Sequence, residues 1–85
     1  MTLKELEFDS MLKAVGRVVQ EKRTQLGLSQ EELARRSNLH RTYISDVERG
    51  SRSVSLITLC KLAKALHVEA SALVLGAEAN CDGGA

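Results

Sequence analysis

The middle of the chain carries a short run of polar side chains suited to hydrogen bonding with an external partner. If residues 41–49 form a helix, Ile44 and Val47 share one apolar face because they lie three positions apart. The opposite face then carries four polar residues: Arg41, Thr42, Ser45 and Asp46. Guanidinium, hydroxyl and carboxylate groups are those that hydrogen bond to base edges in the major groove of a DNA duplex. We therefore predict that these four residues contact bases.

Each of these side chains has alternative partners. Arg41 can donate two parallel hydrogen bonds to guanine O6 and N7, or it can contact a phosphate instead. Thr42 offers its hydroxyl to a base or its methyl group to thymine. Asp46 either accepts a hydrogen bond from cytosine N4 or orients Arg41 or Arg49. We favour the orienting role, because phosphates repel a carboxylate that lacks a cationic neighbour.

Local signals predict two short helices joined by a tight turn. Ser29 and Glu32 have the spacing of a capping box, which fixes the start of the first helix. Asn38 tolerates the left-handed conformation that often ends a helix, so the chain is expected to turn at Asn38 and Leu39. The second helix then runs from residue 40 or 41 to about 49, and Gly50 ends it. Two short helices around such a turn are the layout of a helix-turn-helix.

Three further helices are predicted around this pair. The first spans about residues 10–26, with an apolar stripe and Gly27 as its stop. Ser55 caps another helix, whose inward stripe is predicted to contain Leu56, Leu59, Cys60, Ala63 and Leu66. A short last helix spans residues 70–75 and ends at Gly76. The sequence thus predicts an all-α domain of five helices over residues 10–76, with a lead segment (1–9) and a flexible tail (77–85). Thr2 and Glu5 form a second capping box, which starts a short extra helix or extends the first helix.

The central motif resembles a known family. Residues 28–34 read Leu-Ser-Gln-Glu-Glu-Leu-Ala, and residues 44–50 read Ile-Ser-Asp-Val-Glu-Arg-Gly. This pattern resembles the phage-repressor-like (lambda-repressor, Xre-type) helix-turn-helix regulators over about residues 15–75. Within that family, residues 39–50 with Arg52 and residues 54–56 are most similar to controller proteins of restriction-modification systems. Asn38 stands where the family often has Gly, and Ser53-Val54 replaces a common Asn-Pro.

The resemblance implies roles for several other residues. Gln30 matches a family glutamine that holds a phosphate at a helix N-terminus. Arg23 and Glu48 match a family pair that fastens the first helix to the end of the recognition helix. His40 stands where a capping Ser or Thr is common, so it either caps that helix or lies against the DNA backbone. Further contacts with the backbone are expected from residues along the flank of the recognition helix: Tyr43, Arg49 and Arg52.

The size of the chain favours a homodimer, and its charge is compatible with DNA binding but does not by itself indicate it. The chain has 85 residues and a formal net charge of only +1. The eleven basic side chains within residues 11–68 nevertheless exceed the five acidic ones, which is compatible with a phosphate backbone. Because so small a domain buries only a modest core, a second copy is expected to cover part of its apolar surface. The dimer interface is predicted at His67, Val68, Leu73, Val74 and Leu75, of which Val68 and Leu73 are also core candidates.

The expected partner is double-stranded DNA carrying an inverted repeat, which a two-fold dimer would match. Binding over a promoter would exclude RNA polymerase, whereas binding just upstream could recruit it. No cofactor, metal or membrane is expected, and the chain is expected to be cytoplasmic. An antitoxin-like interaction module with autoregulatory DNA binding is the alternative. No paired carboxylates, activated nucleophile or phosphate-binding glycine loop point to an enzyme.

Overall fold

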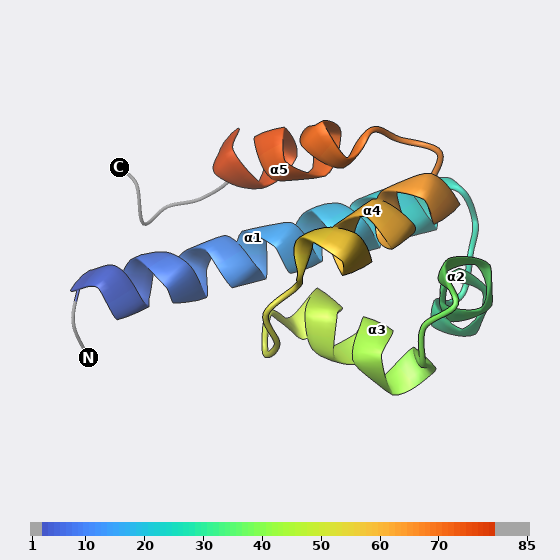
Figure 1. Cartoon of the computed structure of the whole chain (residues 1–85), viewed down its shortest axis with the longest axis horizontal. Coiled ribbons are helices and arrows are strands. Elements are labelled where there is room, and N and C mark those ends of the chain that lie inside the picture. Colours follow the sequence, from blue (N-terminus) through green and yellow to red (C-terminus); the bar gives the residue numbers. More distant parts are fainter. Residues whose placement is uncertain (1–2, 80–85) are drawn as a thin grey trace.

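The computed structural model describes residues 3–79, which form five helices and no strand, as the sequence predicts. The helices are α1 (Leu3–Gln25), α2 (Gln30–Ser37), α3 (Arg41–Arg49), α4 (Leu56–Ala65) and α5 (Ala70–Ala79). Figure 1 shows α1 as the long rod on which α3 and α5 pack. Helix α2 packs on α3 and α4, and α4 packs on α5. Among the described residues, none of the helices combines the length and apolar character needed to cross a membrane.

The predicted helix ends of the central pair are confirmed. The Ser29 hydroxyl accepts a hydrogen bond from the Glu32 amide at 3.1 Å, and the Ser29 amide donates to the Glu32 carboxylate at 3.1 Å. At the other ends, Asn38 (φ 58°) and Gly50 (φ 72°) adopt the left-handed conformation. Ser55 caps α4 by accepting a hydrogen bond from the Thr58 amide. Local hydrogen bonding therefore fixes where α2, α3 and α4 begin or end.

The first and last helices are longer than predicted. Helix α1 begins at Leu3, so residues 3–9 of the lead segment continue the first helix. Helix α5 runs through Gly76 to Ala79, which makes the predicted stop at Gly76 wrong. A Cβ at Gly76 would lie 3.3 Å from a methyl group of Val18, so this glycine permits close packing of α5 on α1. Thr2 and the tail beyond residue 79 lie outside the described residues.

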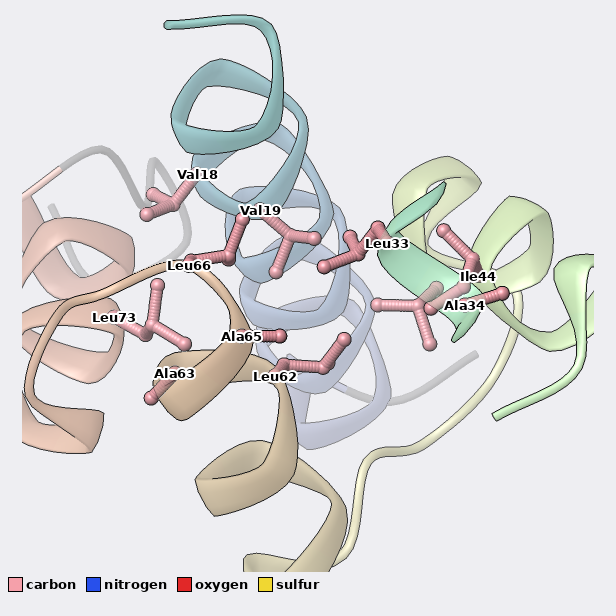
Figure 2. Packing of buried hydrophobic residues seen from close by; sticks show 11 residues of the cluster. Val18, Val19, Leu33, Ala34, Ile44, Leu62, Ala63, Ala65, Leu66 and Leu73 are labelled. Atoms are coloured by element: carbon pink, nitrogen blue, oxygen red, sulfur yellow. The ribbon is translucent and has the colours of Figure 1, made fainter. Parts of the chain in front are cut away.

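The hydrophobic core lies where α1, α4 and α5 meet the helix-turn-helix. Figure 2 shows Val19 from α1, Leu33 from α2 and Leu62 from α4 pointing into the same space. The largest fully buried side chains come from all five helices: Val19, Leu33, Ile44, Val47, Leu62, Leu66 and Leu73. Burying side chains of this size contributes about 1.5–3 kcal/mol each to folding. Helix α3 is thus attached to the core through Ile44 and Val47.

Two members of the stripe predicted for α4 are not in the core. Leu56 is 73% exposed and the Cys60 thiol is also exposed, so their predicted inward positions are wrong. The buried side of α4 is centred on Leu62, Ala63 and Leu66. At 100° per residue, positions 56 and 60 fall to one side of that centre. The face that they occupy is therefore turned away from the core.

Candidate nucleic-acid interface

The outer face of α3 is open while its inner face is fixed. Ile44 and Val47 are 0% and 1% exposed, whereas Arg41 and Thr42 are exposed to solvent. Ser45 and Asp46 lie between these extremes, half-buried on the same helix. The four predicted base-contacting residues thus lie on a helix held by the core, and Arg41 makes no ion pair within residues 3–79. Its guanidinium remains available to an external acceptor.

Asp46 is the centre of a small network on α3. Its carboxylate forms an ion pair with Arg49 and a second one with Arg52 at 3.4 Å. Arg49 also donates a hydrogen bond to the Ser45 hydroxyl at 2.5 Å. The carboxylate therefore orients Arg49, one of the two arginines proposed for it, and also Arg52, which sequence reasoning did not connect with it. Two cations around one carboxylate leave this part of the surface positive.

Tyr43 links the recognition helix to the loop that follows it. Its hydroxyl donates a hydrogen bond to the Ser53 carbonyl oxygen at 3.4 Å. The Arg52 guanidinium lies over its ring, 5.2 Å from the ring centroid, at a distance typical of a cation–π contact. Arg52 is thus held by both Tyr43 and Asp46 while more than half of its side chain stays exposed. This geometry presents a guanidinium beside α3.

Arg23, Glu48 and Gln30 form a second network that joins three helices. Arg23 donates from Nε to Glu48 Oε2 at 2.7 Å and from Nη2 to Glu48 Oε1 at 3.0 Å. Its Nη1 donates to the Leu28 carbonyl oxygen at 2.7 Å, and Gln30 Nε2 donates to Glu48 Oε1 at 3.0 Å. The hydrogen bonds from Arg23 to Glu48 raise the pKa of the guanidinium, although its partial burial opposes the shift. The network connects α1, α2 and α3.

Gln30 and His40 lie at the starts of α2 and α3. One amide hydrogen of Gln30 is used on Glu48, which leaves the second for a phosphate. The backbone amides in the first turn of a helix also lack partners within the helix, and they favour an anion. His40 is the exposed residue before α3, and its side chain makes no capping hydrogen bond. The capping alternative for His40 is therefore wrong.

The predicted dimer residues separate into a core residue and a surface set. Leu73 is 0% exposed and belongs to the core of its own chain, so it is not available to a partner. Val74 and Leu75 are exposed, Val68 is half-buried, and His67 lies in the loop before α5. Val74 and Leu75 line a groove of about 660 Å³ together with Leu56 and Leu59 of α4. Sequence reasoning missed these two leucines because it assigned them to the core.

The comparisons with known proteins agree on the kind of protein that this chain is similar to. A family profile described as helix-turn-helix matches residues 19–73. The chain is similar to control protein C.BamHI of Bacillus amyloliquefaciens, with 60% identity over 42 residues, or 49% of this chain and 52% of the relative. It is also similar to control protein C.SmaI of Serratia marcescens, with 57% identity over 47 residues, or 55% of this chain and 56% of the relative. The chain thus matches about half the length of these curated relatives.

Among solved structures, the chain is similar to the restriction-modification controller protein C.AhdI from Aeromonas hydrophila. The TM-score is 0.72 and the identity 50%, covering 73% of this chain and 94% of that one. The wild-type restriction-modification controller protein C.Esp1396I gives a TM-score of 0.74 and 36% identity, covering 82% of this chain and 90% of that one. These structures share the arrangement of five helices seen here.

Proposed function

This chain belongs to the helix-turn-helix family of the lambda-repressor (Xre) type, and from that premise we propose that it is a DNA-binding transcription regulator that reads a specific sequence through α3. The observation that carries the proposal is the asymmetry of α3. Its apolar side is buried at Ile44 and Val47, while Arg41 and Thr42 are exposed on the opposite side. A rigidly held helix with an open polar face is the element that enters the major groove in this class of protein.

Each network has a distinct task in this proposal. Arg41 donates to guanine O6 and N7, and Thr42 contacts the neighbouring base. Asp46 holds Arg49 and Arg52 in position to contact phosphates, and the Tyr43 ring packs against the Arg52 guanidinium. Gln30 and the first amides of α2 bind a phosphate of the adjoining strand. Phosphate contacts then set the register in which Arg41 reads the bases.

We further propose that a second copy of this chain covers the groove between α4 and α5. The groove is lined by apolar side chains that no part of residues 3–79 covers, with Leu56 73% and Leu75 68% exposed. Its acidic residues, Glu69 and Glu78, form a polar border. A two-fold dimer that reads both halves of an inverted repeat must hold its two copies of α3 about 34 Å apart, one turn of B-DNA. The operator is then an inverted repeat.

The regulated genes are proposed to be those of a restriction-modification system. The named relatives C.BamHI, C.SmaI and C.AhdI, at 50–60% identity over the matched regions, are control or controller proteins. A direct check is the identity of the neighbouring genes together with a reporter fused to their promoter. Genes for a methyltransferase and an endonuclease, with a reporter that responds to this protein, support the role. Unrelated neighbours and an unresponsive promoter contradict it.

Selection of bound duplexes from random DNA tests the proposal for α3. Wild-type protein should enrich one inverted repeat, with affinity that falls steeply as salt rises. Arg41→Ala should remove the preference at one base pair of each half-site, a loss of about 1–3 kcal/mol in discrimination. Arg41→Lys is the matched control, because it keeps the charge but not the two parallel donors, and it should lose selectivity while retaining the salt dependence.

Two results would count against this assignment. If Arg41→Ala enriches the same sequence as the wild type, Arg41 does not read a base. If the wild type binds no duplex at low salt, the chain is not a DNA-binding regulator.

A further inference from the structure

Each of the first four helices is followed within two residues by a residue with positive φ. Glycine fills this position after α1 (Gly27, φ 71°) and after α3 (Gly50, φ 72°). Asn38 (φ 58°) fills it after α2, and His67 (φ 60°) fills it after α4. A Cβ atom makes this conformation unfavourable, and glycine adopts it at no such cost. Asn38 tolerates this conformation through its short polar side chain, so His67 is the end that needs another explanation.

Both of these side chains border the same cavity. It has a volume of about 430 Å³ and lies between the C-terminal ends of α2 and α4, lined in part by Asn38 and His67. The C-terminal ends of α2 and α4 are closed by the same kind of backbone hydrogen bond, between residues five positions apart. Leu39 N donates to Ala34 O at 2.9 Å, and Val68 N donates to Ala63 O at 3.0 Å. No residue of α3 and none of the α4–α5 groove lines this cavity. It is a separate site from those described above.

The cavity is strongly basic. Arg36 of α2 and Lys61 and Lys64 of α4 line it together with His67, and no Asp or Glu is among the lining residues. All four of these side chains are exposed, and none of the three cations has an ion-pair partner within residues 3–79. One cation at a helix C-terminus is common because it compensates the helix dipole. Arg36 and Lys64 lie in the last turns of α2 and α4 and have this role, whereas Lys61 adds a further positive charge, and no carboxylate among the lining residues balances it.

We propose that this cavity binds a small phosphate-bearing ligand. Three permanent charges match a doubly charged phosphate better than a carboxylate, and a guanidinium can donate two parallel hydrogen bonds to phosphate oxygens. The Asn38 amide and the His67 imidazole add further hydrogen-bond donors beside these cations. The cavity is open to solvent on one side, and its volume of about 430 Å³ leaves room for a ligand larger than an inorganic ion. This assignment does not depend on DNA binding by α3.

Titration of the 85-residue protein tests the site. Binding of orthophosphate, pyrophosphate and ADP would be measured by titration calorimetry and by NMR spectra of the backbone amides. The ionic strength is held constant, and acetate is the monovalent control. Saturable binding of a phosphate probe is expected, with shifts confined to amides near residues 36–39 and 61–68. Tighter binding of ADP than of pyrophosphate indicates a nucleotide ligand. Equal binding of the two probes indicates an inorganic phosphate ligand. If the signal rises linearly with the concentration of every probe and never saturates, the proposal is overturned.

Charge-removing variants locate the binding. Arg36→Gln combined with Lys64→Gln should weaken the affinity at least about tenfold, the effect of losing one charged hydrogen bond. Arg35→Gln is the matched control, since Arg35 is exposed on the same helix but does not line the cavity. It should bind like the wild type. An equal loss in this control means diffuse attraction to the whole protein and overturns the site.

His67→Gly separates binding from folding. Because glycine accepts the positive φ, the melting temperature should be unchanged or higher while the affinity for the phosphate probe falls. A lower melting temperature with unchanged affinity would show that His67 serves the fold alone, which contradicts the proposal. The last measurement is binding to a DNA duplex selected from random sequences. If Arg36→Gln with Lys64→Gln weakens duplex binding in phosphate-free buffer and no probe binds the wild type, these cations contact the DNA backbone and the proposal is wrong.

Discussion

Arg23 and Glu48 lie 25 residues apart in the chain and are joined by two hydrogen bonds, from Nε to Oε2 at 2.7 Å and from Nη2 to Oε1 at 3.0 Å. The Glu48 side chain is only 4% exposed and that of Arg23 only 12%. Because Glu48 belongs to α3, this pair fixes α3 to the long helix α1. Gln30 binds the same carboxylate, which extends the restraint to α2.

Replacement of Arg23 by Met should destabilise the protein by about 3 kcal/mol, because it leaves the Glu48 carboxylate buried without its cation. Replacement of both Arg23 and Glu48 by Met should cost less than the single change, since no uncompensated charge remains. Urea unfolding of the two variants measures the difference. A single variant as stable as the double one would mean that the pair contributes little.

Gly16 lies where α1 packs tightly against α3. A Cβ at this position would lie 2.4 Å from the Val47 carbonyl oxygen, closer than any real Cβ contact. Gly16→Ala should therefore push the helices apart and cost about 1–3 kcal/mol, typical of overpacking. Gly27→Ala is the control for backbone strain alone, because Gly27 has φ 71° but nothing within 4 Å of its Cβ position. Thermal unfolding should show a larger loss for Gly16→Ala, and equal losses would contradict the packing argument.

The capping box of α2 should make stability depend on pH. The Ser29 amide donates to the Glu32 carboxylate, which lowers the pKa of that group, and the Ser29 side chain lowers it further. A lowered pKa in the folded state contributes stability above the pKa of the unfolded chain. This contribution is lost as the pH falls through the folded pKa.

Glu32→Gln keeps a hydrogen-bond acceptor and removes the charge. The stability difference between wild type and this variant should be largest near neutral pH and shrink below about pH 4. Chemical unfolding at several pH values measures it. A difference that does not change with pH would show that the charge is unimportant.

Asp46 should control specificity more than affinity. Asp46→Asn removes the carboxylate that holds Arg49 and Arg52, and it also removes a negative charge from the side of α3 that is proposed to face DNA. We expect tighter binding to random duplexes and a lower ratio of specific to non-specific affinity, because freed arginines contact phosphates in any sequence. Fluorescence anisotropy with a selected operator and a shuffled duplex measures this ratio. A variant with reduced affinity for both duplexes in equal proportion would contradict the prediction.

The α4–α5 groove should be required for dimer formation. Leu75→Glu places a charge where the proposed interface excludes water, so it should shift the protein toward monomer. Ile57→Glu is the control, since Ile57 is 67% exposed on α4 but does not line the groove. Sedimentation equilibrium compares the dissociation constants, and operator binding should weaken in parallel. If Ile57→Glu dissociates the protein as strongly, the interface lies elsewhere on α4.

Local features of this protein could be predicted because each depends on residues a few positions apart. The Ser29–Glu32 capping box and the left-handed Asn38 require only local backbone geometry. Gly50 is a local helix stop as well, although a Cβ there would also lie 2.7 Å from Lys13 Cα of α1. The buried side of α3 follows from the spacing of Ile44 and Val47 on a helix. The Arg23–Glu48 connection was expected from a resemblance to a family and not from spacing, because no local rule joins positions 25 residues apart.

The errors arise where a local pattern has two explanations. A glycine such as Gly76 often ends a helix, but here it lies within α5, where its lack of a side chain lets α5 pack closely against Val18 of α1. Leu56 and Cys60 fit an apolar stripe, but the direction of α4 relative to α1 and α5 turns them toward solvent. Periodicity gives the angle between side chains on one helix and does not say which side meets the core.

The sequence by itself determined that the chain folds into five helices, where the central ones begin and end, and which polar residues line the outer side of α3. Only the tertiary structure decided that Asp46 is shared by Arg49 and Arg52. It also decided that Leu56 and Leu59 join Val74 and Leu75 in one groove, and that Asn38 and His67 border one basic cavity. The physical reason is that caps and periodicity act within one or two turns of a helix. The Asp46–Arg52 pair depends on the course of the loop after α3. The groove and the cavity depend on how separate helices cross, and the packing of the whole core sets those crossings.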